Sequence, residues 1–191
     1  ILRKSRGLVQ CVYEAGGTDF DIRDLKEESA VEVMGVVKAE ERAPQGFEIR
    51  LKEIRVLSQP AEPLPLAVSK WKLNTSLETK LSLRPISLRN VRERAKFKIQ
   101  EGIVRGFRDY LLSQGFTEIR TPKIVARGAE GGSNVFKLEY FNKKAELGQS
   151  PQFYKQTMVG VYDRVFEAAP VFRAEKHNTT RHLNEYTSLD R

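Results

Sequence analysis

Hydrophobic and polar positions alternate over much of residues 1–59, which predicts a region rich in β-strands. An apolar stretch bounded by glycines, residues 8–13, is typical of a buried strand, and residues 21–28 can form a short helical turn. A second strand is marked by Val31, Val33 and Val36. A third strand has alternating apolar residues over 47–51, and the alternation resumes at 54–56 after a shift of one residue, which predicts a β-bulge. This pattern fits the later strands of an OB barrel.

The pattern changes to a connector and a long helix after residue 59. Three prolines within residues 60–65 predict a stiff linker, which we extend through residue 84. Over residues 89–114 an apolar stripe steps mainly by four: Val91, Ala95, Ile99, Ile103, Phe107, Tyr110 and Leu111. Gly115 is placed to end this helix, and residues 116–124 predict a strand, with Pro122 restricted to an edge or an interface. Together these elements predict an α+β chain with a first domain over 1–59 and a second over 85–191.

Composition narrows the class of protein. A chain of 191 residues, 40% of them hydrophobic and without a long apolar run, can bury one good core or two small ones and predicts a soluble protein with no membrane span. The single cysteine, Cys11, and the lack of a signal-peptide pattern suit the cytoplasm. A net charge of +8 indicates a polyanionic partner such as nucleic acid, although much of the excess lies in residues 70–108, where it must coat a helix.

The densest candidate chemistry lies in residues 173–186, Arg-Ala-Glu-Lys-His-Asn-Thr-Thr-Arg-His-Leu-Asn-Glu-Tyr. An alternating run, 165–172, precedes it, and a mixed run ending at Asp190 closes it, which predicts two antiparallel strands joined by a polar loop. Arg173 and Glu175 would lie at the inner end of the first strand. The second strand would open with Arg181, His182 and Tyr186. A cleft with these groups can hold a nucleoside triphosphate beside a carboxylate; the alternative for an Arg-x-Glu pair alone is a charged surface hairpin.

This string resembles motif 2 of the class II aminoacyl-tRNA synthetases, most closely that of the archaeal-type aspartyl enzymes. Residues 149–155, Gln-Ser-Pro-Gln-Phe-Tyr-Lys, are similar to the segment with which those enzymes read the side-chain carboxylate of aspartate. The helix over 89–114 and the strand after it resemble motif 1, which builds the class II dimer interface. The resemblance implies a partial OB-fold anticodon-binding domain and the first part of an antiparallel-sheet catalytic domain. Motif 3 is missing from the sequence, so we expect a fragment that is inactive by itself.

The resemblance also implies a role for each residue of the string. Arg173 would be catalytic, because a fixed guanidinium offsets the repulsion between the aspartate α-carboxylate and the α-phosphate of ATP. ATP would contact Arg173, Glu175, Arg181, His182, Leu183 and Tyr186. The tRNA acceptor end would meet Lys176, His177, Asn178 and Thr179. Mg²⁺ is expected with ATP, held mostly by phosphates and by residues absent from this chain; the two histidines make a poor metal site.

Aspartate itself would be bound by Glu130, Gln152, Lys155 and Arg173. The cation of Lys155 favours a carboxylate over a neutral amide, since an unpaired buried charge is costly. Glu130 lies in a glycine-rich loop that resembles a flap closing over the substrate ammonium group, with an ordinary surface loop as the alternative. Pro44 lies in a turn that looks like that of family members charging both aspartate and asparagine tRNAs.

The implied function is the ATP-dependent activation of L-aspartate and its transfer to tRNA by a homodimer. Two alternatives stay within the class: an asparaginyl enzyme, and a synthetase-like paralogue without tRNA charging. The alternative from another class is a non-catalytic nucleic-acid-binding OB module.

Overall fold

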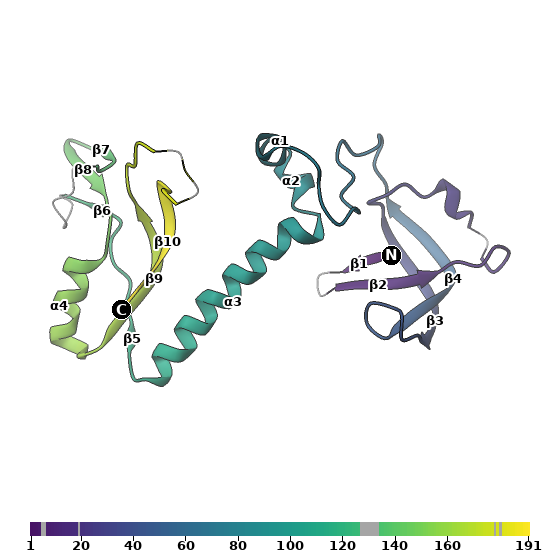
Figure 1. Ribbon diagram of the computed structural model, residues 1–191, viewed down its shortest axis with the longest axis horizontal. Coiled ribbons are helices and arrows are strands. Elements are labelled where there is room, and N and C mark those ends of the chain that lie inside the picture. Colours follow the sequence, from purple (N-terminus) through teal and green to yellow (C-terminus); the bar gives the residue numbers. More distant parts are fainter. Residues whose placement is uncertain (5–6, 19, 127–133, 178, 180) are drawn as a thin grey trace. The chain divides into compact units, whose positions relative to one another are not determined.

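The computed structural model of the protein describes residues 1–4, 7–18, 20–126, 134–177, 179 and 181–191 (Figure 1). The chain divides into two compact units, Ile1–Glu93 and Arg94–Arg191. Both units combine helical segments with sheets in which antiparallel pairing predominates, which confirms the α+β class. The boundary between the units lies in the first turn of a long helix, beyond the predicted end of the linker at residue 84.

The first unit is built on one four-stranded sheet. Its strands, in the spatial order β1-β2-β4-β3, are β1 (Leu2–Lys4), β2 (Gly7–Val12), β4 (Phe47–Ser58) and β3 (Ala30–Ala39). Strands β2 and β4 pair in parallel, and the other pairs are antiparallel. A single 3-10 turn, η1 (Ile22–Asp24), stands where a helical turn was predicted. In β2 only Val9 is buried, so the strand is less enclosed than its apolar sequence predicts.

The predicted bulge lies in β4. Met34 pairs with Glu53 and Gly35 pairs with Leu51, so Lys52 is the extra residue. A Cβ atom at Gly35 would lie 2.2 Å from the backbone oxygen of Arg50, which is why this position requires glycine. The bulge at Lys52 therefore explains the shift in hydrophobic pattern between Leu51 and Ile54, as predicted.

The segment predicted as a plain linker contains two short helices, α1 (Leu77–Ser82) and α2 (Arg84–Ser87). Ser76 begins α1 by accepting a hydrogen bond from the backbone N–H of Thr79. Val68 and Leu73, farther back in the segment, are buried. Prolines and polar residues separate these buried positions, so no helical period is visible in this region of the sequence.

The predicted long helix is α3 (Val91–Ser113). Asn90 caps its start by accepting hydrogen bonds from the N–H groups of Arg92 and Glu93, and Gly115 follows its end with φ 77°. Burial of the apolar stripe is incomplete among the described residues: Leu111 is buried, whereas Ile99 and Ile103 are more than half exposed.

The described residues of the second unit form two three-stranded sheets and one further helix. One sheet has the order β10-β9-β5, formed by β10 (Glu185–Asp190), β9 (Val165–Phe172) and β5 (Thr117–Glu118). The other has the order β6-β8-β7, formed by β6 (Ile124–Val125), β8 (Lys143–Leu147) and β7 (Lys137–Tyr140). The helix is α4 (Gln152–Tyr162).

The prediction of one strand over residues 116–124 is wrong, because β5 and β6 are separate short strands. Pro122 between them has no N–H to donate to a ladder. The N–H of Thr121 is also taken, since it donates to the carboxylate of Glu167 at 2.7 Å. The Glu167 side chain therefore takes the hydrogen bond that the backbone of a neighbouring strand would otherwise accept.

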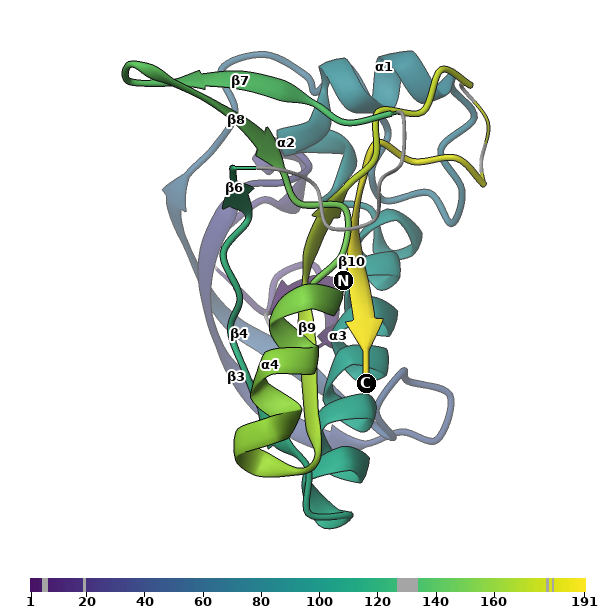
Figure 2. The same ribbon diagram turned by 90° about the vertical axis from the view of Figure 1, so that its left-hand side faces the viewer.

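Helices α3 and α4 lie on opposite sides of the β9–β10 pair, as Figures 1 and 2 both show. On the α3 side, Phe107 contacts Phe166 edge to face, with ring centroids 5.6 Å apart. Phe166 is completely buried and belongs to the core of this unit. None of the helices in the described part of the chain is both long and apolar enough to cross a membrane.

Candidate active site

The β9–β10 hairpin provides the frame of the candidate site, and its pairing is antiparallel as predicted. Side chains alternate between faces along each strand, so Tyr186, Ser188 and Asp190 lie on one face of β10. Their partners on β9 are Val171, Ala169 and Glu167. Directly opposed residues project to the same side of a sheet, so these six positions line one continuous face.

Arg173 lies immediately after β9, at one end of this face. Its N–H donates to the carbonyl oxygen of Asn184 at 2.9 Å, which fixes the backbone where the hairpin opens. Its guanidinium carbon lies 5.9 Å from the ring centroid of Tyr186, a cation–π distance. The structure thus brings together two of the residues assigned to ATP.

The predicted strand positions of Glu175, Arg181 and His182 are wrong. The N–H of Glu175 donates to the carbonyl oxygen of Arg173 at 2.8 Å, which marks a tight turn. Arg181 and His182 lie in a second turn, where His182 bridges to Thr179. The Thr179 hydroxyl lies 2.7 Å from Nδ1 of His182 and accepts from the N–H of Arg181 at 3.3 Å. Such local side-chain hydrogen bonds compete with a strand ladder.

Most of the predicted ATP and tRNA residues in this loop are exposed: Lys176, His177, Thr179, Arg181, His182 and Leu183. The His177 and His182 rings lie 5.7 Å apart. Asn178 of the loop and Glu130 of the predicted flap lie outside the described residues. Pro44 is exposed, in the turn between β3 and β4.

Lys155 lies on the first turn of α4, which the sequence did not predict as a helix. Its ammonium donates to Oδ1 of Asp190 at 3.0 Å and to the carbonyl oxygen of Arg191 at 3.1 Å. The side chain is only 15% exposed, unlike an ordinary surface lysine. Gln152, at the start of the same helical turn, is exposed, and its N–H donates to the hydroxyl of Ser150 at 3.1 Å.

The carbonyl oxygen of Asn134 joins the two predicted binding segments. It accepts from the side-chain amide of Gln149 at 2.8 Å and from the N–H of Ala174 at 3.0 Å. Gln149 is buried, so this junction excludes water beside the segment that carries Lys155. The segments on either side of the site are therefore tied together by one backbone group.

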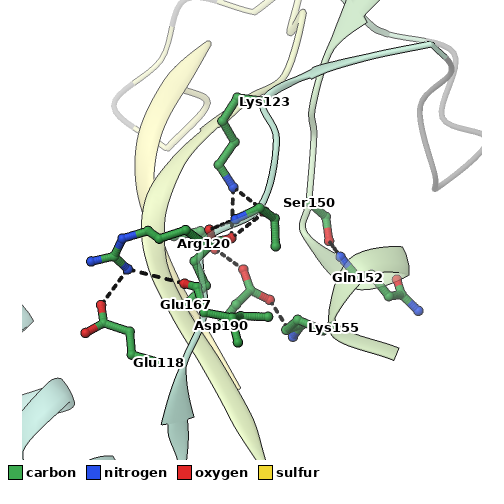
Figure 3. A network of polar contacts seen from close by, with 11 residues as sticks. Glu118, Arg120, Lys123, Ser150, Gln152, Lys155, Glu167 and Asp190 are labelled. Carbon is green, nitrogen blue, oxygen red and sulfur yellow. Dashed lines mark hydrogen bonds and ion pairs between the residues drawn. The ribbon is translucent and has the colours of Figure 1, made fainter. Parts of the chain in front are cut away.

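Sequence reasoning missed three charged residues around Lys155: Lys123, Glu167 and Asp190 (Figure 3). Burial raises the pKa of the Asp190 carboxyl, but hydrogen bonds from Ser188 and Lys155 and the charges of Lys155 and Lys123 outweigh it, so the pKa lies below its ordinary value. Glu167 is 1% exposed and accepts from Lys123 at 2.8 Å. The only sequence signal for Glu167 is a charged residue at an inward position of an apolar strand.

The two cations assigned to the substrates lie on the same face of the sheet. Arg173 approaches Tyr186 and Lys155 approaches Asp190, and these two anchors share one face of β10. Four residues along a strand span roughly 13 Å. Long side chains reaching inward from both ends can therefore meet one ligand with two anionic groups.

Comparison with known proteins decides the family. Residues 76–191 match the family described as tRNA synthetases class II (D, K and N). The chain belongs to the class II aminoacyl-tRNA synthetases. The aspartate–tRNA(Asp/Asn) ligase of Deinococcus radiodurans is 50% identical over 190 residues, and that of Thermus thermophilus is 50% identical over the same length. Each alignment covers all of this chain but only 42% and 44% of the respective relative.

A solved synthetase shares the fold. The crystal structure of asparaginyl-tRNA synthetase from Pyrococcus horikoshii, complexed with asparaginyl-adenylate, aligns with a TM-score of 0.85 and 35% identity. The alignment covers 98% of this chain and 44% of that one. The chain thus spans less than half the length of the synthetases it matches.

Proposed function

We propose that this chain is part of an aspartate–tRNA ligase. L-Aspartate and ATP would form aspartyl-adenylate and pyrophosphate, and the aspartyl group would then pass to the terminal ribose of tRNA(Asp). The relatives named above are ligases for both tRNA(Asp) and tRNA(Asn), which supports charging of tRNA(Asn) as well. The exposed Pro44 turn is our candidate for that choice of tRNA.

The observation that carries the proposal is the shielded ammonium of Lys155 on the same sheet face as Arg173. A mostly buried cation favours a substrate carboxylate over a neutral amide, because its hydrogen bond to a charged carboxylate is stronger than its hydrogen bond to an amide oxygen. This argues for aspartate over asparagine. Gln152, on the same helical turn, and Glu130, in the flap, would complete the aspartate site.

The nucleotide would occupy the Arg173 end of the face. Arg173 would bridge the attacking carboxylate and the α-phosphate, so that the two anions approach against fixed positive charge. Tyr186 would stack on the base, and the other ATP contacts would come from Glu175, Arg181, His182 and Leu183. Lys176, His177, Asn178 and Thr179 would meet the acceptor end of the tRNA, and of these Lys176, His177 and Thr179 are exposed.

The proposal also includes Mg²⁺ as a cofactor and a cytoplasmic location. It further includes a homodimer joined through α3 and the strand after it. The described residues contain no group of three or more His, Cys, Asp or Glu side chains suited to a metal ion. The metal ion would be held mostly by the ATP phosphates, whose charge it would neutralise.

Amino-acid-dependent exchange of pyrophosphate into ATP tests the proposal, using the complete gene product that contains these residues. We expect exchange with aspartate and little with asparagine. Substitution Lys155→Met should lower kcat/KM for aspartate by about 100-fold or more, because a shielded charge pair with the substrate is lost. The matched control is Lys143→Met at an exposed position of β8. Exchange with asparagine that exceeds exchange with aspartate would contradict the proposal.

A further inference from the structure

Two carboxylates oppose each other at the Lys155 end of the candidate site. Glu167 and Asp190 are directly paired across the antiparallel β9–β10 ladder, so their side chains share one face. Like charges in this arrangement destabilise a sheet unless cations compensate them. Glu167 is nearly inaccessible to water, which increases the need for a fixed partner.

Lys123 supplies the cation for Glu167. Its ammonium donates to Oε2 of Glu167 at 2.8 Å and to the hydroxyl of Thr121 at 2.9 Å. Thr121 donates to the same carboxylate twice, from its N–H at 2.7 Å and its hydroxyl at 2.8 Å. Glu167 is therefore held in one orientation by three hydrogen bonds from the short segment before β6, and a fourth hydrogen bond joins Lys123 to Thr121 within that segment.

The cluster is electrically balanced without ligand. Lys123 and Lys155 provide two ammonium groups against the carboxylates of Glu167 and Asp190. Asp190 is faced by Lys155 from α4, by Glu167 from β9 and by Ser188 from its own strand, and the charge of Lys123 also acts on it. A substrate carboxylate at Lys155 would bring a third anion into this group, so the position of each cation then matters.

We propose that Lys123 is a positioning residue for aspartate recognition: by neutralising Glu167 it leaves Asp190 to orient Lys155, whose ammonium then donates to the substrate carboxylate. This inference rests on the proposed function. Lys123 would touch no substrate and would act only through Glu167 and Asp190. Without it, Lys155 would have to compensate two opposed carboxylates and would bind a third more weakly.

The test combines three variants of the complete gene product: Lys123→Gln, Lys123→Arg, and the double variant Lys123→Gln/Glu167→Gln. In aspartate-dependent exchange, Lys123→Gln should raise KM for aspartate roughly tenfold, with KM for ATP changed by less than about twofold. Lys123→Arg, which keeps the charge, should restore most of the loss. The double variant should also recover, because it removes the carboxylate together with its cation. Lys143→Gln in β8 is the surface control.

A merely structural role predicts a different result. It would change the two KM values together, or leave the double variant at least as impaired as Lys123→Gln, and either outcome overturns the proposal. Lys123→Gln on its own could fail to fold, but the double variant has no unpaired buried charge. In that case the KM values of the double variant for aspartate and for ATP are compared with those of wild type, and the same criteria apply.

A second readout separates this inference from the proposed function. Carbon-13 NMR of the Asp190 carboxyl should show its titration midpoint rising in Lys123→Gln and returning toward the wild-type value in the double variant. Wild type without aspartate-dependent exchange would refute the proposed function, but the titration would still report whether Lys123 governs Asp190. An unchanged Asp190 midpoint in Lys123→Gln would refute the inference even in an active enzyme.

Discussion

At the scale of single residues, the account depends on how each charge is shielded and paired. Lys155 is mostly buried and has a defined carboxylate partner, whereas Arg173 is exposed and stacks on Tyr186. The first arrangement suits selection of a small substrate, because a desolvated charge discriminates strongly between ligands. The second leaves the guanidinium accessible, as the proposed contact with an ATP phosphate requires.

Replacement of Arg173 by lysine tests whether the reaction needs the planar, bidentate hydrogen-bonding geometry of a guanidinium group. Arg173→Lys keeps the charge but loses bidentate geometry, so we expect exchange to slow by about 100-fold, corresponding to about 3 kcal/mol of transition-state stabilisation. Steady-state exchange kinetics measure this, with Arg105→Lys on the exposed surface of α3 as the control. Equal rates for Arg173→Lys and wild type would contradict the catalytic role proposed for the Arg173 guanidinium.

The lowered pKa of Asp190 predicts an acid-sensitive contribution to stability. A carboxyl group whose pKa is lower in the folded state stabilises the fold above its unfolded pKa of about 3.9, and this contribution is lost as pH falls through the lower folded value. Urea unfolding of wild type and Asp190→Asn should therefore differ more at neutral pH than below about pH 3. A difference in unfolding free energy that stays constant with pH would contradict the assigned pKa shift.

The sequence predicted individual residues of the candidate site better than it predicted how those residues pair. Lys155 and Arg173 stand in recognisable strings, so the sequence pointed to both. Asp190, Glu167 and Lys123 come together only through the β9–β10 register and the break in the ladder at Thr121. Those pairings join residues up to 46 positions apart, and no local pattern specifies them.

At the scale of elements, periodicity predicted helix α3 and the strands β2, β3, β4, β9 and β10, and it missed helix α4 and the break between β5 and β6. The stripe of α3 and the bulge in β4 follow from spacing alone. The string over residues 149–155 predicts a binding segment but not its secondary structure, so α4 was not expected. The interrupted strand before β6 was missed because its hydrogen bonds go to a side chain.

Asn90 gives the sharpest test at this scale, since it is fully buried and connects α3 to the segment before α1. Its side-chain oxygen caps α3, and its amide donates to the carbonyl oxygens of Val68 and Lys70 at 3.0 and 2.6 Å. We expect Asn90→Ala to lower the unfolding free energy by about 2–4 kcal/mol, since it loses a cap and leaves buried groups unpaired.

Asn90→Asp separates the two roles, because a carboxylate can still cap the helix but cannot donate to the two carbonyl groups. Urea denaturation measures both variants, with Gln156→Ala on the exposed side of α4 as the control. A loss in Asn90→Ala no greater than that of the control would mean that these hydrogen bonds do not hold the segment.

At the scale of the whole molecule, the net charge of +8 becomes meaningful once the family is known. Class II synthetases must hold a polyanion during the second step of their reaction. A positive protein attracts a polyanion from a distance, and under the proposed function Lys176 in the exposed loop would add a local contact. The sequence alone left nucleic-acid binding open, because many of its lysines and arginines are accounted for by the solvent-facing surface of the long helix.

Salt should therefore weaken binding of tRNA. We expect the logarithm of the association constant to fall linearly with the logarithm of salt concentration between about 50 and 200 mM, as phosphate contacts release counterions. Fluorescence anisotropy with labelled tRNA(Asp) measures the slope, and Lys176→Ala should make it shallower. Binding that does not respond to salt would exclude this electrostatic contribution.

Under the proposed function, Lys155 and Arg173, on one face of the β9–β10 pair, bind the two anionic groups of a single ligand. A crystal structure of the complete gene product with a non-hydrolysable aspartyl-adenylate analogue would show whether they do. We expect the β-carboxylate within about 3.2 Å of the Lys155 ammonium, with the phosphate mimic at the Arg173 guanidinium. An analogue bound on the α3 side of the strands, or with its carboxylate away from Lys155, would contradict it.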